Sequence, residues 1–398
     1  MFTVRAGEDF GVKPRVAWYT PQVLPYSQTF VANQLAALRG VDSRLFGVES
    51  VPDIAAPGKA WVLESDCTFG RIQSLLFKAT RRSPALHGAL KEFDPSVLIA
   101  HFLQCAWRVS QVAKSVGIPL AAMCHGSDFL TLRGSRRHQS WSTRQLAGNW
   151  RVFIEEIPLF LAASAFLRNR LLEAGVPSSR VAVHYLGVPI PDGAGLGSAK
   201  ERSGVLFVGR LVENKGCGLL LTAVGRLASG RRVDVTVVGD GPQRSALEKQ
   251  AADLPSSAKI HFVGKLQQDA VFRLMRQHRV LCVPSTEVAS GASEGLGLVA
   301  CEAAAHGRPV IAFDTGGLRE TLIHGTTGLL VPPRNVGELA EALEAVLSDD
   351  SLADAMGRAA RQLATERFDL SVQGHRLHEL LVTRDLISGR HSREAKPG

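Results

Sequence analysis

Short apolar runs alternate with amphipathic stretches along the whole chain, a pattern typical of parallel β-sheets flanked by helices. In the first half, Phe166–Ala174 has helical spacing and stops before Gly175, a residue common just after helices. The strand-like runs in this half are Val16–Tyr19, Val97–His101, Leu120–Cys124, Leu161–Ser164 and Val181–Tyr185. The first half is therefore expected to fold as one α/β unit.

The second half repeats the pattern more clearly. Its predicted strands are Val205–Val208, Val233–Val238, Ile260–Val263, Val280–Val283 and Val310–Phe313. Its predicted helices lie near Gly218–Leu227, Gln243–Ala252, Val271–Gln277, Leu296–Ala305, Val336–Leu347 and Ser351–Thr365. Each strand run leads into Gly, Pro or Ser, and loops at this edge of a doubly wound sheet bind ligands. A second α/β unit is expected here.

A chain of 398 residues is too long to fold around a single ordinary hydrophobic core and is long enough for two domains. We expect an N-terminal Rossmann-like domain over residues 1–190, a Pro/Gly-rich linker over 187–204 and a C-terminal Rossmann-like domain over 200–368. A final helix over 370–387 is expected to pack back on the first domain, and residues 388–398 are expected to be disordered. Six scattered cysteines, no bilayer-length apolar run and no apolar block near the start predict a cytoplasmic protein with buried thiols.

The net charge of +9 is uneven, since residues 1–195 hold 21 Lys and Arg against 14 Asp and Glu, whereas the rest holds 25 against 23. Dense basic stretches occur at Arg71–Arg82 and Arg133–Arg151. Without interleaved basic and aromatic residues this charge does not indicate nucleic acid. It fits an anionic membrane face or a phosphate-bearing acceptor, or else a solvated basic face without a partner.

The first candidate site is Val208-Gly209-Arg210-Leu211, with Lys215 five residues after the arginine. Arg210 follows a strand and Lys215 opens the next helix, so the two cations could neutralise a pyrophosphate that Gly209 lets approach the backbone. An ordinary loop with solvated cations is the alternative. The turn at Gly239 and Gly241 permits close backbone approach to a ligand but occurs in many α/β proteins.

The second candidate is the segment Ser293-Glu294-Gly295-Leu296-Gly297-Leu298 together with Glu302. The amides of Gly295, Leu296, Gly297 and Leu298 at a helix start would suit an anionic phosphate. Glu294 is then better explained as an acceptor for sugar hydroxyls, and an ordinary acid at a helix N-terminus is the alternative. Glu302 lies among residues that look buried, and because an unpaired buried carboxylate is costly we expect it to bind a ligand rather than to be a surface charge.

A third candidate lies in the first half, at Cys124-His125-Gly126-Ser127-Asp128. His125 follows a strand and could bond a sugar hydroxyl or phosphate, and Asp128 could orient it or cap a helix. His101 ends the preceding strand and could line the same wall. A purely structural loop role is the alternative for both histidines. No D-x-D, P-loop, G-x-S-x-G or G-x-G-x-x-G motif occurs in a supporting position, so no metal or dinucleotide cofactor is expected.

The ordered motifs G-R-L-x-x-x-K-G, V-G-D-G-P, E-G-x-G-x-x-x-x-E-A and G-x-P-V-I-A resemble the retaining glycosyltransferases of family 4, which have the GT-B fold of two Rossmann-like domains facing across a cleft. Tyr26–Phe30 and His125–Asp128 resemble the exopolysaccharide and lipopolysaccharide subgroup, although Gln28 replaces the usual acid. The resemblance implies a metal-independent transfer from a nucleotide-diphosphate sugar to a glycan or polyprenyl-diphosphate-linked acceptor in cell-surface polysaccharide biosynthesis.

The resemblance also implies roles for individual residues. Arg210 and Lys215 would bind the diphosphate above the Gly295–Leu298 amides, Glu294 the donor sugar and Glu302 the ribose. His125 would contact the reacting sugar from the other domain. Two other functions stay open: a sugar-nucleotide epimerase on the same fold, and a non-catalytic nucleotide-sugar-binding scaffold.

Overall fold

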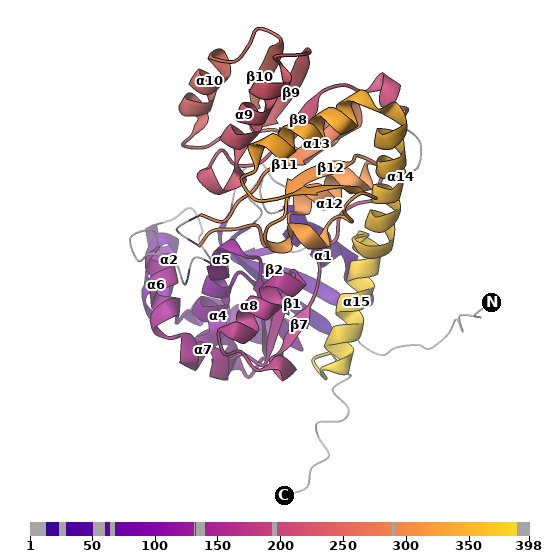
Figure 1. Cartoon of the computed structure of the whole chain (residues 1–398). Helices are drawn as coiled ribbons and strands as arrows, with labels where there is room; N and C mark the ends of the chain where they lie inside the picture. Colours follow the sequence, from indigo (N-terminus) through magenta and orange to yellow (C-terminus); the bar gives the residue numbers. More distant parts are fainter. Residues whose placement is uncertain are drawn as a thin grey trace, which may run out of the picture.

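The computed structural model describes residues 13–23, 29–50, 60–63, 68–130, 132, 140–192, 197–288 and 291–387. Within them the strands form two parallel sheets, one of seven strands and one of six. The two sheets lie in separate layered domains, one above the other in Figure 1, with helices on both faces. This confirms the predicted α/β architecture of two Rossmann-like domains.

The N-terminal sheet has the strand order β3-β2-β1-β4-β5-β6-β7, so the order reverses between β1 and β4. Its strands are β1 (Arg15–Val23), β2 (Asp42–Ser50), β3 (Ala60–Val62), β4 (Val97–His101), β5 (Leu120–Cys124), β6 (Leu159–Ala162) and β7 (Val181–Val183). Its helices are α1 (Thr29–Ala37), α2 (Thr68–Thr80), α3 (Pro84–Phe93), α4 (Leu103–Val116), α5 (Ser127–Leu130), α6 (Trp141–Gly148), α7 (Trp150–Glu156) and α8 (Ala165–Glu173).

The C-terminal sheet has the order β10-β9-β8-β11-β12-β13 and reverses between β8 and β11. Its strands are β8 (Val205–Val208), β9 (Val233–Val238), β10 (Ala258–Gly264), β11 (Val280–Val283), β12 (Val310–Phe313) and β13 (Gly328–Val331). Its helices are α9 (Cys217–Leu227), α10 (Arg244–Ala252), α11 (Gln268–Gln277), α12 (Leu298–Ala305), α13 (Val336–Ser348) and α14 (Asp350–Arg367), followed by α15 (Leu370–Thr383).

Three strands were not predicted from the sequence. β2 mixes charged and apolar residues, β3 is three residues long, and β13 begins with a glycine. The predicted strand Leu161–Ser164 corresponds to β6, which begins two residues earlier and ends two residues earlier, at Ala162. Ser164 instead caps α8, because its side chain accepts a hydrogen bond from the Leu167 amide.

The last helices cross from the second domain to the first (Figure 1). α14 runs along the C-terminal domain, and the Val188 amide donates to the Phe368 carbonyl at the junction with α15. α15 then packs on α1 so closely that a Cβ at Gly374 would lie 2.1 Å from the Ala37 carbonyl oxygen. Leu377 and Leu381 are buried in the N-terminal core. The expectation of disorder for residues 388–398 lies outside the described residues.

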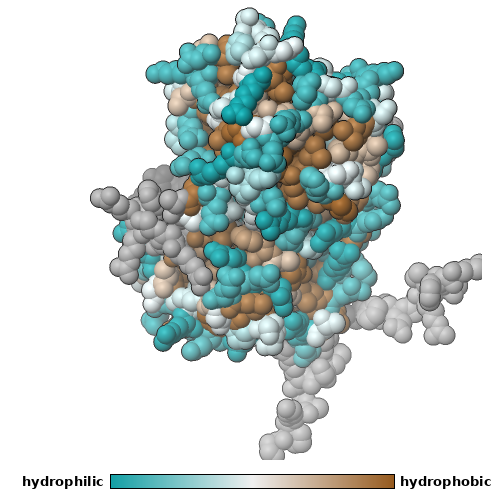
Figure 2. Space-filling model, in the orientation of Figure 1, coloured by the Kyte–Doolittle hydropathy of each residue, from teal (hydrophilic) through white to brown (hydrophobic). Residues whose placement is uncertain are grey.

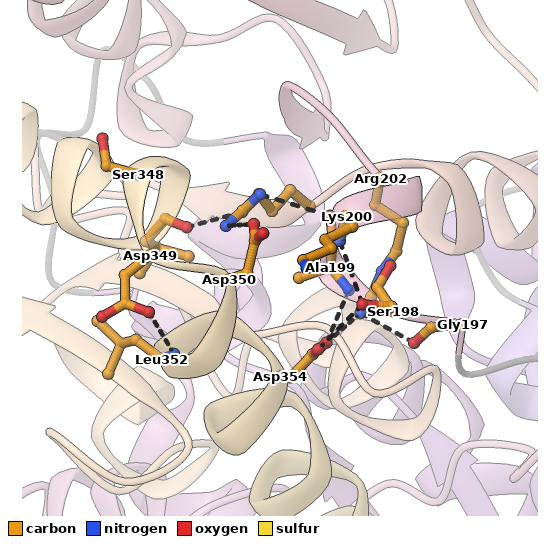
Figure 3. A network of polar contacts seen from close by, with 12 residues as sticks. Gly197, Ser198, Ala199, Lys200, Arg202, Ser348, Asp349, Asp350, Leu352 and Asp354 are labelled. Atoms are coloured by element: carbon orange, nitrogen blue, oxygen red, sulfur yellow. Dashed lines mark hydrogen bonds and ion pairs between the residues drawn. The ribbon is translucent and has the colours of Figure 1, made fainter.

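A polar network holds the end of the interdomain linker against α14 (Figure 3). Asp354 accepts hydrogen bonds from the Ala199 amide at 2.8 Å and from the Arg202 guanidinium at 2.7 Å. Asp349 caps α14 by accepting from the Leu352 amide at 2.9 Å. These contacts fix the point at which the chain enters β8, and therefore the start of the second sheet.

Apolar side chains fill the interiors of both domains, and hydrophilic residues cover much of the face drawn in Figure 2. The five described cysteines are buried and free, as expected, whereas Cys67 lies outside the described residues. In the described part of the chain no helix combines the length and apolarity needed to cross a bilayer.

Candidate functional site

The loops after β8 and β11 meet because these two strands are neighbours at the reversal of the C-terminal sheet. Ligands bind at such reversals in open α/β sheets, where the loops on either side diverge. Lys215 ends a short 3-10 helix after β8, and Glu294 lies in the loop between β11 and α12. The strand order thus brings together two charged residues that are 79 positions apart.

Lys215 and Glu294 form an ion pair, with 2.6 Å between Nζ and Oε2. The Ser285 hydroxyl donates to the same carboxylate oxygen at 3.0 Å. Burial alone would raise the pKa of Glu294, but the Lys215 ammonium and the two hydrogen bonds outweigh it and leave the pKa below its ordinary value. Glu294 is therefore an ionised, well-oriented hydrogen-bond acceptor near neutral pH.

Arg210, the other predicted cation, also lies in the loop after β8. Its side chain is exposed and makes no ion pair within the described residues. The structure therefore places Arg210 and Lys215 on one loop but gives only Lys215 a partner.

The candidate glycines hold the loops together. A Cβ at Gly239, which has a φ of +131°, would lie 1.9 Å from the Gly209 carbonyl oxygen. A Cβ at Gly241 would lie 2.4 Å from the Leu211 carbonyl oxygen. Only glycine allows this approach, so these residues pack the loop after β9 against the loop after β8.

α12 begins at Leu298, two residues later than predicted, because Gly297 adopts a φ of +88° as its N-cap. This N-cap has no side chain to accept hydrogen bonds from the first turn. A Cβ at Gly297 would lie 2.4 Å from a Leu318 methyl carbon and 3.4 Å from Glu294 Cγ. The segment Gly295–Leu298 thus begins a helix directly beside the Lys215–Glu294 pair.

Glu302 lies on α12 among buried alanines and Cys301, as the sequence predicted. Its side chain accepts a hydrogen bond from Gln268 Nε2 at 3.1 Å. Burial raises the pKa of Glu302 to about 7, because this single hydrogen bond lowers it only in part. Glu302 is therefore a poorly neutralised carboxylate with remaining capacity to accept hydrogen bonds.

His125 follows β5, and His101 ends the neighbouring strand β4. His101 Nδ1 and His125 Nε2 are 3.0 Å apart, and the two rings stack with centroids 5.2 Å apart. Phe30 and Phe102 enclose His125, with ring centroids at 4.9 and 4.7 Å. Burial lowers the pKa of both histidines, that of His125 to about 3, so both rings are neutral. Among the described residues, His125 Nδ1 has no hydrogen-bond partner.

Asp128 orients the loop rather than the imidazole. One carboxylate oxygen accepts from the amides of His125 at 3.0 Å and Gly126 at 2.7 Å. The other oxygen accepts from the Leu103 amide at the start of α4, at 2.9 Å. Burial nevertheless raises the pKa of Asp128 to about 6. The imidazole of His125 is oriented by His101.

The two candidate sites meet across the domains at Gly126 and Gly295. A Cβ at Gly295 would lie 2.0 Å from the His125 carbonyl oxygen, and one at Gly126 would lie 2.7 Å from Gly295 Cα. The Ser164 hydroxyl donates to the Gly295 carbonyl at 2.6 Å. The loop that carries His125 therefore lies directly on the segment that follows Glu294.

A second contact between the domains was missed from the sequence. Glu320 of the C-terminal domain accepts hydrogen bonds from the Ala165 and Phe166 amides at 2.7 and 2.8 Å, at the start of α8. The Tyr185 hydroxyl donates to the same carboxylate at 2.8 Å. No motif marks Glu320, since only the arrangement of the domains brings it to the helix start.

Parts of two sequence features lie outside the described residues. They are Tyr26–Gln28 of the subgroup motif and residues 133–139 of the second basic stretch. Phe30, the last residue of the subgroup motif, is described and contacts His125.

Two family models match the chain in succession. The model described as Glycosyltransferase Family 4 matches residues 29–190, and the model described as Glycosyl transferases group 1 matches residues 194–363. Between them they cover most of both domains.

Several curated proteins are similar in sequence. A glycogen synthase of Mycobacterium tuberculosis is 29% identical over 71% of this chain and 67% of its own length. A GDP-mannose-dependent alpha-(1-6)-phosphatidylinositol monomannoside mannosyltransferase of the same species is 33% identical over 55% of this chain and 60% of its own length. The matched segments thus span about two thirds of the first relative and less of the second.

Solved structures share the fold. The Anabaena protein HepE, in complex with UDP and glucose, has a TM-score of 0.73 at 19% identity and covers 93% of this chain and 100% of its own. A sucrose-phosphate synthase from Thermosynechococcus elongatus has a TM-score of 0.72 at 20% identity and covers 94% of this chain and 100% of its own.

Proposed function

Because this chain belongs to the family 4 glycosyltransferases, enzymes of the GT-B fold, we propose that it moves a sugar from a nucleotide-diphosphate sugar to a glycan or polyprenyl-diphosphate-linked acceptor, with retention, in cell-surface polysaccharide biosynthesis. The observation that carries the proposal is the Lys215–Glu294 pair beside the start of α12. It combines a cation, a helix start whose N-cap is a glycine and an oriented carboxylate, the groups that a sugar diphosphate requires.

The donor would lie across this site. Lys215 and Arg210 neutralise the diphosphate together with the Gly295–Leu298 amides, and Glu294 accepts from sugar hydroxyls. Glu302 accepts from the ribose hydroxyls, which matches its spare acceptor capacity. His125 reaches the sugar from the N-terminal domain, since its loop lies on Gly295.

The reaction would proceed without a carboxylate nucleophile. The sugar–phosphate bond breaks through an oxocarbenium-like state while the cations and helix amides stabilise the departing phosphate. The acceptor hydroxyl attacks from the same face, and its proton passes to a phosphate oxygen. Glu294 is already engaged by Lys215 and Ser285, so its role is to position the sugar.

Incubation with UDP-, GDP- and ADP-sugars, with and without a polysaccharide or lipid-linked acceptor extract, tests the proposal. We expect release of nucleoside diphosphate that is faster with acceptor present. Conversion of the donor to a different sugar nucleotide without acceptor would instead indicate the epimerase. Donor binding with neither hydrolysis nor transfer would indicate a non-catalytic scaffold.

Glu302→Gln is expected to remove a pH dependence of donor binding. The pKa of Glu302 is about 7 in the free protein, and ribose hydroxyls bind the ionised form. Donor affinity of the wild type should therefore fall about tenfold as the pH drops from ~8 to ~6. Titration of the nucleotide sugar at each pH should give a flat profile for the variant; equal slopes in both proteins would refute the assignment.

His101→Phe is expected to lower kcat about tenfold, the equivalent of one hydrogen bond of ~1.4 kcal/mol. Phe keeps the stacking on Trp18, whose ring centroid is 5.6 Å away, but cannot bond His125 Nε2. His101→Asn retains an amide near the Nδ1 position and should recover most of the loss. If both variants lose kcat equally, His101 acts through packing alone.

We also propose that the N-terminal domain contacts an anionic membrane surface through α2. Ile72, Leu75 and Leu76 on this helix are 49, 65 and 55% exposed, and the exposed residue Arg82 follows two positions after the helix ends. Apolar and basic groups together bind anionic interfaces. Leu75→Ser should reduce flotation with phosphatidylglycerol vesicles relative to wild type, whereas Val382→Ser, at an exposed residue of α15, should not. Equal flotation of wild type and Leu75→Ser would refute this contact.

A further inference from the structure

A pocket of about 400 Å³ lies at the carboxyl ends of strands β1, β2 and β4 in the N-terminal sheet. The strand order reverses between β1 and β4, as it reverses between β8 and β11 in the other sheet. The second reversal holds the Lys215–Glu294 pair, so the pocket occupies the equivalent position in the first domain. The described residues that line it are Pro21, Val48, Lys78, Phe102, Gln104, Cys105, Arg108, Ser140, Ser142 and Thr143.

The charged residues in the described lining of this pocket are cationic. Lys78 and Arg108 line it, and none of its described lining residues is acidic. A larger pocket of about 850 Å³ on the same domain also has cationic residues, but there Glu155, Glu156 and Asp385 accompany them. Arg108 is half-buried and makes no ion pair within the described residues, so its charge is available to a ligand.

The remaining polar groups of the pocket can donate hydrogen bonds. α6 begins there, with Ser140 as its N-cap and the Ser142 hydroxyl 3.0 Å from the Ser140 hydroxyl. α4 begins there too, but its first amide, that of Leu103, already donates to the buried Asp128 carboxylate. The start of α6 adds positive potential to that of Arg108. An anion is the ligand that this combination favours.

Phe102 connects the pocket with the reaction site. Its ring lines the pocket and packs on His125 with centroids 4.7 Å apart. Its φ of +69° is rare for a bulky residue. The Phe102 side chain would therefore be all that separates a ligand in the pocket from His125, the histidine proposed to contact the donor sugar.

We propose that this pocket binds an anionic group of the acceptor, a phosphate or a carboxylate, through Arg108. The inference rests on the proposed transferase function and specifies its acceptor class. With the anion held there, the acceptor's hydroxyl extends past Phe102 toward His125 and the donor sugar.

Calorimetric titration of the full chain, saturated with whichever of UDP, GDP and ADP binds it, tests the proposal. Glucose 6-phosphate against glucose probes a soluble acceptor. Vesicles of phosphatidylcholine with and without phosphatidylglycerol probe a lipid one. We expect the anionic probe of at least one pair to bind at least tenfold more tightly, and Arg108→Gln to remove about tenfold of that affinity.

Lys91→Gln is the matched control, since it removes the same charge from an exposed position on α3. Ser142→Glu places a carboxylate in the pocket without changing Arg108 and should also weaken anion binding. The proposal is overturned if neither anionic probe binds wild type more tightly than its neutral counterpart. It is also overturned if Arg108→Gln and Ser142→Glu bind the preferred anionic probe as tightly as wild type does. Nucleotide-sugar binding is measured for wild type and for every variant. If wild type does not bind a nucleotide sugar, the transferase function is overturned. If wild type binds a nucleotide sugar but Arg108→Gln binds the anionic probe as tightly as wild type does, only the anion site is overturned.

Discussion

Glu294→Ala is expected to lower kcat for sugar transfer by at least ~100-fold while the protein remains folded. The carboxylate holds the donor sugar, and Lys215 and Ser285 fix its orientation. Alanine removes the sugar contact and frees the Lys215 ammonium to move toward the diphosphate. Nucleoside diphosphate alone should therefore bind the variant at least as tightly as wild type, which separates a lost sugar contact from a disrupted site.

Initial-rate kinetics, calorimetric titration with nucleoside diphosphate and circular dichroism check this prediction. Glu338→Ala is a suitable control, because it removes a carboxylate at the start of α13 that accepts a hydrogen bond from the side chain of the N-cap residue Asn335. Near-normal turnover of Glu294→Ala would refute the role assigned to Glu294.

Gly295→Ala should lower kcat about 100-fold. The cause would be displacement of the loop that carries His125, since the substitution removes no functional group. The new Cβ would lie 2.0 Å from the His125 carbonyl oxygen, so the loop that carries His125 has to move away. A shift of about 1 Å in a reacting site can cost about 100-fold in rate. The amide of residue 295 remains, so affinity for nucleoside diphosphate should change little.

Gly88→Ala is the control for this substitution, because no atom lies within 4 Å of a Cβ at that position on α3. Its kcat should equal that of wild type. A normal kcat for Gly295→Ala would mean that the contact between the two domains at Gly126 and Gly295 is not required for turnover.

β5 and β11, two strands predicted with their exact bounds, are buried on both faces. All four residues of β11 and all five of β5 are buried, so they stand out as uninterrupted apolar runs. β2 was missed because Asp42, Arg44 and Glu49 interrupt its apolar residues. An apolar run that no charged residue interrupts therefore made a strand predictable, whereas the charges in β2 concealed it.

The sequence predicted individual residues of the candidate site, but it did not predict the contacts between them. Motifs identified Lys215 and Glu294 separately, whereas their ion pair depends on β8 and β11 being neighbours, which follows from the strand order. Ser285 bonds Glu294 from the loop after β11, and Gln268 bonds Glu302 from the first residue of α11; no motif marks either residue. Glu320 gains its partners only when the domains come together. Contacts between distant loops thus required the structure.

In the proposed mechanism, the loops after β8 and β11 bind the donor diphosphate. Calorimetric titration of the full chain with UDP-, GDP- and ADP-sugars, in wild type and in the double variant Arg210→Gln, Lys215→Met, tests it most directly. We predict that wild type binds at least one of them with one site per chain and that the double variant loses at least ~100-fold of that affinity. Failure of all three to bind wild type, or equal binding by the double variant, would contradict the claim.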